Sequence, residues 1–260
     1  MPLTLYQVDA FTDTVFKGNP AAVIPLEHWL PDETLLNIAI ENNLSETAYF
    51  TPEGDDYRLR WFTPGGEVDL CGHATLATAY TLFEELNYDR DTITFNSRSG
   101  PLHVTKKNDG YMMDFPIWEY KKAPIPDVIA QAFGQYPVAF FTGYDDIAVF
   151  ERAEDIRDMQ PDFNMLKNHK TRGVLITAPG DHDYDFISRA FFPRLNINED
   201  PVTGSAHCLL APYWSERLKK KSFKAHQASE RGGDLYCEIK GDRLEITGNA
   251  ALYMKGEIYV

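Results

Sequence analysis

Two short stretches of the chain carry residues that could hold an anion and move a proton. "DLCGHATLATAY" (69–80) and "DPVTGSAHCLLAPYW" (200–214) each place an Asp ahead of a Gly, and small and apolar residues follow. Such a run predicts a helix, and the first backbone N–H groups of a helix can bind a carboxylate or phosphate. The sequence therefore predicts two helix starts, at Gly72 and Gly204, that are suited to an anionic ligand.

These two glycines share their spacing with a second pair. "SRSG" ends at Gly100 and "SERG" ends at Gly232, so that 204 minus 72 and 232 minus 100 both give 132. Two anchors with one offset indicate a duplicated unit, and we expect the binding site to lie between the copies. The simpler alternative, in which Gly72 and Gly204 only allow tight strand-to-helix turns, stays open.

The composition excludes several classes of protein. The 260 residues are 43% hydrophobic, which is ample for packed cores. A formal charge of −14 would repel nucleic acid and anionic membrane surfaces, so we expect neither as a partner. No apolar run approaches the roughly 18 residues that span a bilayer, and "MPLTLYQVD" is typical of a strand rather than a signal peptide. We therefore expect a cytoplasmic protein.

The three cysteines, Cys71, Cys208 and Cys237, are odd in number and form no C-x-x-C pair. This pattern argues against a disulfide framework and against a zinc cage. We expect reduced thiols and no metal.

Helices are predicted where apolar residues recur at helical spacing or where small residues occupy every side. Pro212 should kink or shorten the last of these helices. Strands are predicted where short aromatic and β-branched runs end at Gly, Pro, Asn or Asp. The predicted helices are 31–43, 72–86 and 205–218, and the predicted strands are 3–11, 21–24, 46–50, 57–62, 91–95, 148–150, 173–178, 184–192, 235–239 and 244–247.

Lys and Pro crowd together in "EYKKAPIPD" (119–127), which shows little periodicity. We place the domain boundary in this segment. The predicted organisation is an N-terminal lobe, 1–120, and a C-terminal lobe, 121–260, from which the last strand could cross back to the first lobe.

Four ordered segments resemble the signature segments of the phenazine biosynthesis PhzF-like isomerase family, within the diaminopimelate epimerase-like fold. The resemblance implies an α+β fold of two pseudo-symmetric lobes, each a rolled, mostly antiparallel sheet around a central helix. It also implies an active site between the lobes. The segments are "QVDAFTDTVFKGNPAAV" (7–23), "NLSETAYF" (43–50), "DLCGHATLATAY" (69–80) and "EDPVTGSAH" (199–207).

The resemblance implies catalytic roles for Glu46, His73 and Asp200. Glu46 matches the acid/base of the family, and at the edge of the apolar run "TAYF" it could be desolvated enough to exchange protons near neutral pH. His73, as a neutral imidazole, would relay or position a proton, and Asp200 would orient the substrate. Without the resemblance, Glu46 would be interpreted as a solvated residue at a strand start.

The resemblance also implies that Ser205 binds the substrate carboxylate together with the helix starts at Gly72 and Gly204. In the epimerases of this fold, a Cys before each helix-opening Gly supplies one of two facing bases. Cys71 matches the first, but Thr203 stands at the second position, which argues against a two-thiol racemase. We interpret Cys71 as a packing residue.

The predicted function is a cofactor-independent isomerase that moves a proton within a small carboxylate by single-carboxyl acid/base catalysis. It would need neither a metal nor a cofactor, and family analogy suggests a homodimer. Two alternatives stay open: an amino-acid racemase or epimerase, and a non-catalytic metabolite-binding protein. The sequence does not identify the substrate.

Overall fold

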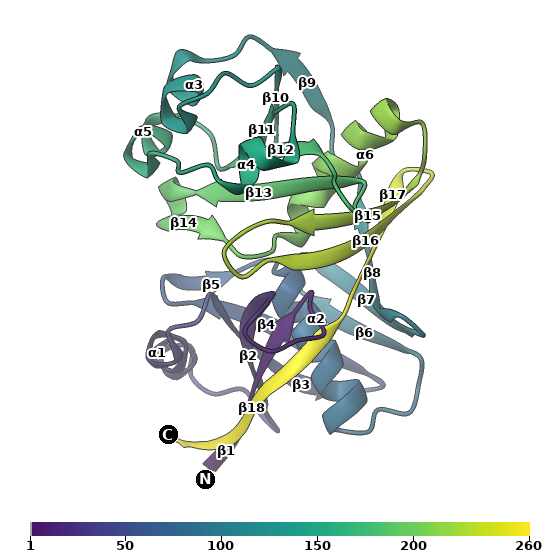
Figure 1. Ribbon diagram of the computed structural model, residues 1–260. Helices are drawn as coiled ribbons and strands as arrows, with labels where there is room; N and C mark the ends of the chain where they lie inside the picture. The colour runs from purple at the N-terminus through teal and green to yellow at the C-terminus, as the bar shows by residue number, and fades with distance from the viewer. Residues whose placement is uncertain (1) are drawn as a thin grey trace. The chain divides into compact units, whose positions relative to one another are not determined.

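The computed structural model describes residues 2–260, which form two compact units (Figure 1). The first unit runs to Asp114 and takes in Thr247–Val260, and the second comprises Phe115–Ile246. The sequence places the boundary after residue 120, whereas the chain in the structure changes units between Asp114 and Phe115.

The first unit is a mostly antiparallel sheet with two α-helices and one π-helix among its described residues. β1 lies antiparallel between β2 and β18, β2 runs parallel to β3, and β4 pairs with β3, β5 and β6. Its strands are β1 (Pro2–Ala10), β2 (Asn19–Pro25), β3 (Glu46–Glu53), β4 (Asp56–Thr63), β5 (Gly66–Val68), β6 (Thr92–Ser97), β7 (Gly100–Lys107), β8 (Gly110–Pro116) and β18 (Ala250–Tyr259). Its helices are α1 (Asp32–Asn42), α2 (Gly72–Tyr80) and the π-helix η1 (Thr81–Glu85).

The second unit has strands β9 (Tyr120–Ala123), β10 (Ala139–Gly143), β11 (Asp146–Val149), β12 (Val174–Pro179), β13 (Phe186–Phe192), β14 (Ile197–Asp200), β15 (Ser222–Gln227), β16 (Gly233–Lys240) and β17 (Arg243–Gly248). Its helices are α3 (Asp127–Phe133), α4 (Ala153–Arg157), α5 (Phe163–Asn168) and α6 (His207–Leu218), with 3-10 turns η2 (Pro193–Leu195) and η3 (Gly204–Ala206).

The strand pairings of the first unit recur in the second in the same order. β1–β2 and β10–β11 are antiparallel, β2–β3 and β11–β12 are parallel, and β3–β4 and β12–β13 are antiparallel. β4 then pairs antiparallel with β5 and parallel with β6, as β13 does with β14 and β15. The two-lobed, mostly antiparallel fold predicted from the sequence is thereby confirmed.

The repeated glycines lie at matching points of the two units. Gly72 begins α2 after β5, and Gly204 begins η3 after β14. Gly100, with φ of 95°, is the first residue of β7, directly after the β6–β7 turn, and Gly232, with φ of 65°, lies in the β15–β16 turn. Both φ values fall in the left-handed region that Gly adopts most readily, which explains this second pair.

α2 is buried on every side, since all residues from His73 to Ala79 are buried. The predicted helix 72–86 is not uniform, however, because α-helix gives way to π-helix at Thr81. Thr75, Thr78 and Thr81 each donate their hydroxyl to the carbonyl four residues earlier. Such bonds compete with the backbone ladder and disturb helices, which accounts for the change of helix type in physical terms.

Of the two effects predicted for Pro212, a kink or a shorter helix, the shortening does not occur. α6 continues through Pro212 to Leu218. Pro212 has no N–H to donate to the carbonyl of Cys208, but the backbone N–H of Trp118 donates to that oxygen at 3.1 Å. The interruption is therefore compensated within the second unit.

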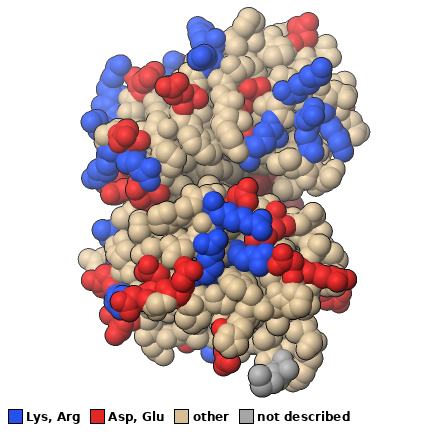
Figure 2. All heavy atoms as spheres, turned by 180° about the vertical axis from the view of Figure 1, so that it is seen from behind, with Lys and Arg blue, Asp and Glu red and all other residues tan. Residues whose placement is uncertain are grey.

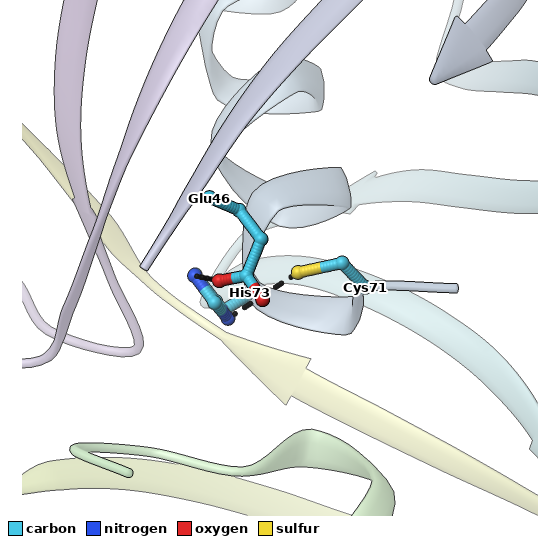
Figure 3. Close-up of side chains that lie close together, drawn as sticks. All are labelled: Glu46, Cys71 and His73. Atoms are coloured by element: carbon cyan, nitrogen blue, oxygen red, sulfur yellow. Dashed lines mark hydrogen bonds and ion pairs between the residues drawn. The ribbon is translucent and has the colours of Figure 1, made fainter. Parts of the chain in front are cut away.

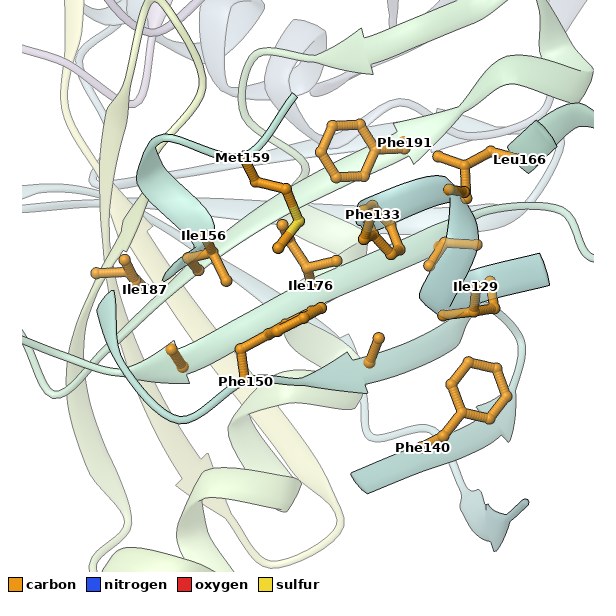
Figure 4. Close-up of a cluster of buried hydrophobic side chains, with 14 of the residues drawn as sticks. Ile129, Phe133, Phe140, Phe150, Ile156, Met159, Leu166, Ile176, Ile187 and Phe191 are labelled. Carbon is orange, nitrogen blue, oxygen red and sulfur yellow. The ribbon is translucent and has the colours of Figure 1, made fainter. Parts of the chain in front are cut away.

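Each unit has its own hydrophobic core. In the first, α1 packs on one face of the sheet through Leu35, against Ile24, Tyr49 and Phe62. In the second, side chains of α3, α4 and α5 pack against β10–β13, with Phe133, Phe150 and Phe191 among them (Figure 4).

The surface carries side chains of both charges, as expected from a sequence with 25 Lys and Arg and 39 Asp and Glu residues. Figure 2 shows Lys and Arg side chains interspersed with Asp and Glu on the face turned away from the viewer of Figure 1. Within residues 2–260, none of the helices has the length and apolar character needed to cross a bilayer.

Candidate functional site

The residue that begins β3, Glu46, faces the start of α2. β2 and β3 run parallel with Ala21 beside Glu46, and side chains in register on neighbouring strands point to the same face. α2 packs against β1, β2 and β3. Glu46 therefore points at the first turn of α2, where Cys71 is the N-cap residue and His73 the second helical residue.

His73 lies at the centre of a small cluster (Figure 3). Its Nε2 lies 3.1 Å from Oε2 of Glu46, and its Nδ1 lies 3.5 Å from Sγ of Cys71. The side-chain amide nitrogen of Asn19 is 3.2 Å from the same Nδ1. The two ring nitrogens thus contact opposite partners, a carboxylate on one side and a thiol and an amide on the other.

The cluster is largely shielded from water. The side chains of His73 and Glu46 are 7% and 14% exposed, and Cys71 is buried. His73 Nε2 and Glu46 Oε2 face each other, yet neither makes a hydrogen bond of normal geometry. Unsatisfied buried polar atoms cost free energy, and they are retained where a ligand or a proton is handled.

The charges of the cluster are coupled. Burial raises the pKa of the Cys71 thiol above its ordinary 9.0, and Glu46 adds to that effect, so the thiol stays protonated at neutral pH. Burial alone lowers the pKa of His73, but Cys71 and Glu46 outweigh it and raise that pKa well above 6.5. With the thiol protonated, the Glu46 carboxylate is the charge that favours the imidazolium. This direction favours a charged His73 rather than the neutral one expected from the sequence, and the protonation state of His73 in the reaction stays a prediction.

Three donor atoms of the cluster are also the kinds that bind transition metals. Glu46, Cys71 and His73 each offer one ligand atom, and the three atoms lie within 4.8 Å of one another.

Asp200, Gly204 and Ser205 lie in the second unit. Asp200 ends β14 and accepts a short hydrogen bond from the hydroxyl of Thr203. The backbone N–H of Thr203 donates to Gln227 Oε1 at 2.8 Å, and Gln227 Nε2 donates to the Asp200 carbonyl at 2.7 Å. Gly204 is buried and Ser205 is partly exposed at the start of η3. That both helix starts bind one anion stays a prediction.

The two residues that follow in the second helix pack in the core. His207 is fully buried, donates from Nδ1 to the Thr203 carbonyl at 3.0 Å, and lies beside Phe186. Burial lowers the pKa of His207 to about 4, so it stays neutral. Cys208 is also fully buried.

Two residues contact His73 that were not predicted to do so, Asn19 and Cys71. Asn19 is fully buried at the first position of β2, and Cys71 contacts His73 rather than only filling space. A polar residue just ahead of the apolar run "PAAV" was the available signal for Asn19. Cys71 gave no such signal, because side chains two residues apart in a helix do not face each other.

Comparison with known proteins identifies the family. The family model described as phenazine biosynthesis-like protein, PhzC-PhzF, matches residues 8–256. The chain is 48% identical to a protein of Pseudomonas aeruginosa named "uncharacterized isomerase", over the full length of both. A crystal structure of a PhzF family protein from Enterococcus faecalis has 50% identity and a TM-score of 0.98, and the match covers 100% of both chains.

More distant structures share the fold alone. A hydroxyproline epimerase from Agrobacterium vitis is 12% identical, with a TM-score of 0.64 over 99% of this chain and 92% of that chain. The resemblance noted in the four sequence segments is confirmed by the family model and by the full-length relatives. The chain belongs to the PhzC-PhzF family of phenazine biosynthesis-like isomerases.

Proposed function

We propose that this protein moves a proton within a small carboxylate substrate, with Glu46 as its acid/base. The observation that supports this most is the Glu46–His73 pair, in which two buried polar atoms face each other without a normal hydrogen bond. A carboxylate held in this way at the start of a buried helix can exchange protons while water is largely kept out.

The proposed reaction has two steps and is redox-neutral. The Glu46 carboxylate removes a proton from a carbon next to an unsaturated or carboxyl group, and the C–H electron pair delocalises as an enolate. The carboxyl group then returns the same proton to another carbon, and the double bond moves. No atom or electron is gained or lost, so the reaction calls for no redox cofactor.

His73 supports Glu46 in this proposal. As an imidazolium it would attract the Glu46 carboxylate across the 3.1 Å between Nε2 and Oε2, and its charge would offset the negative charge that develops on the substrate. The N–H groups at Gly72 and His73 add the positive end of the α2 dipole, worth roughly 0.3–1 kcal/mol per charge and up to about 2 when partly buried.

We assign substrate binding in the second unit to Gly204 and Ser205, with Asp200 orienting a polar group of the substrate. The hydroxyl of Thr203 and the side chain of Gln227 hold the Asp200 segment, which would keep this carboxylate in one position. This assignment rests on the sequence segments and on the local hydrogen bonds.

A racemase or epimerase is the second candidate, and the contact between Cys71 and His73 is the observation that favours it. Its second base would have to come from the position of Thr203, whose hydroxyl is a poor base and donates to Asp200. Single-carboxyl isomerisation needs no such partner, and we prefer it for that reason.

The proposal can be tested without knowing the substrate. A metabolite extract incubated with the protein in heavy water should yield at least one small carboxylate that takes up deuterium only when the protein is present. Uptake at a single stereocentre with inversion would favour the epimerase. No protein-dependent uptake in any extract would favour the metabolite-binding alternative.

A further inference from the structure

The cluster of Glu46, Cys71 and His73 contains one group, the Cys71 thiol, that the proposed acid/base reaction does not use. Glu46 and His73 account for the proposed proton transfer, whereas the Cys71 thiol has no step in it. A thiol, an imidazole and a carboxylate are together the ligands that Zn²⁺ prefers, and Zn²⁺ binds readily to three protein ligands with an open fourth position.

We propose that Glu46, Cys71 and His73 bind one divalent cation of the zinc type. The bound ion would inhibit the enzyme by occupying the atoms that handle the proton. Binding stands on the cluster geometry alone, and only the inhibition rests on the proposed function.

The distances in the cluster suit such an ion. Ligand atoms of a tetrahedral zinc site lie about 3.5 Å apart for a nitrogen–sulfur pair, given Zn–N of about 2.0 Å and Zn–S of about 2.3 Å. Cys71 Sγ and His73 Nδ1 are 3.5 Å apart. The three ligand atoms lie within 4.8 Å of one another, but Glu46 faces the other ring nitrogen, Nε2, so its carboxylate would have to turn toward Nδ1 to complete a tetrahedral face.

His73 Nε2 and Glu46 Oε2 are buried and lie 3.1 Å apart without a hydrogen bond of normal geometry, an arrangement that a bound cation would complete. The ligands come from rigid elements, the first residue of β3 and the first turn of α2. Glu46 is the most exposed of the three side chains, so we expect the ion to reach the cluster from the side of Glu46.

Binding exchanges protons for the ion. Cys71 would lose its thiol proton to solvent, and His73 would lose the proton on the nitrogen that binds, so that a thiolate, a neutral imidazole and a carboxylate face the cation. The charges of the thiolate and of the carboxylate then balance the two positive charges.

Co²⁺ is the probe for the first test, because a Co²⁺–thiolate bond absorbs in the near ultraviolet and a tetrahedral site absorbs in the visible. We expect one equivalent of Co²⁺ to give both bands, Zn²⁺ to displace it, and Mg²⁺ to have no effect. Cys71→Ala should abolish the thiolate band. It should also weaken Co²⁺ binding by more than roughly 10- to 100-fold, which is the loss typical when a residue that only hydrogen-bonds a metal ligand is removed.

The matched control is Cys208→Ala, which removes a buried thiol of the second unit and should leave both bands unchanged. If Cys71→Ala does not fold, X-ray absorption of the wild-type Zn²⁺ complex decides the question, with one sulfur at about 2.3 Å expected. A wild-type protein without the thiolate band, a band that survives in Cys71→Ala, or a zinc complex with no sulfur ligand would overturn the proposal.

The inhibition has a separate readout. Zn²⁺ should suppress protein-dependent deuterium uptake in the wild type at concentrations that saturate the Co²⁺ site. If Zn²⁺ binds but deuterium uptake does not fall, the proposed inhibition is wrong, whereas the proposed metal site is not affected. Absence of uptake in metal-free protein would instead count against the proposed function.

Discussion

The starts of α2 and of η3–α6 occupy equivalent places in the two units but carry different chemistry. Adding 132 to Cys71 and His73 gives Thr203 and Ser205. At the first start, an imidazole contacts a thiol and a carboxylate in a buried cluster. At the second, the Thr203 hydroxyl donates to the Asp200 carboxylate, and the side chain of Gln227 bonds the backbone of Thr203 and Asp200.

The histidines near the two starts show the contrast most clearly. His73 has charged or ionisable neighbours on both ring nitrogens, and its pKa is raised. His207 has only the Thr203 carbonyl and aromatic packing, and its pKa is lowered to about 4. A repeated backbone can therefore support proton chemistry at one copy and fixed hydrogen bonding at the other, because the difference lies in a few side chains.

The largest effect should come from the ionisable cluster. Glu46→Gln keeps the side-chain shape but removes the exchangeable carboxyl, so we expect turnover to fall by about 100- to 10,000-fold, with near-normal ligand binding. Glu41→Gln, on the exposed side of α1, is the matched control and should keep full activity. Steady-state kinetics on the substrate found by deuterium uptake would show this, and a fully active Glu46→Gln would remove Glu46 from the mechanism.

The two histidines should affect stability in opposite pH ranges. Folded His207 stays neutral while the unfolded chain takes up a proton, so its contribution is present above pH 6.5 and is lost as pH falls toward 4. The loss amounts to roughly 3 kcal/mol for a shift of this size. Folded His73 holds its proton, so its contribution is present below pH 6.5 and is lost as pH rises through its folded pKa.

Urea unfolding of wild type, His207→Gln and His73→Gln between pH 4 and 9 would separate these contributions. His207→Gln should flatten the acid side of the profile, and His73→Gln should flatten the neutral-to-alkaline side. The same flattening on one side for both variants would contradict the contrast between the two histidines.

At the second helix start we expect a binding effect rather than a catalytic one. Ser205→Ala would remove the proposed hydrogen bond to the charged substrate carboxylate and should raise KM by roughly 10- to 100-fold while kcat changes little. Thr142→Ala, in an exposed part of β10, is a control that should change neither constant. A fall in kcat without a change in KM would place Ser205 in the chemical step instead.

The smallest effect should be that of Cys71→Ser, which keeps a small polar group beside His73. We expect activity to change by less than about 10-fold, because the thiol takes no part in the proposed proton transfer. A Cys71→Ser variant that is folded but inactive would favour the racemase alternative. Circular dichroism would show whether the variant is folded.

Much of the fold follows from the sequence pattern. The strands at 46–50 and 173–178 and the helix at 31–43 have strong alternation or helical spacing, and the structure places β3, β12 and α1 there. β7 and β18 were missed because they mix polar and exposed residues along their length, as in "GPLHVTKK". Strands with so many exposed residues leave little hydrophobic pattern to detect.

The candidate site was predictable only in part. Glu46 and His73 came from the resemblance, and the structure brings them together. Their contact with Cys71 depends on the extended backbone of that residue, with φ of −146° and ψ of 110°, because this N-cap conformation directs Sγ toward His73. Composition and spacing do not encode a backbone turn of this kind.

The central claim is that one carboxyl group, at Glu46, carries the proton from one carbon to another. The most direct measurement uses a substrate with deuterium at the abstracted position and follows the label in the product by mass spectrometry. Because the Glu46 side chain is only 14% exposed, part of the label should reach the receiving carbon before solvent exchanges it. Complete washout, together with inversion at a single centre, would contradict the claim.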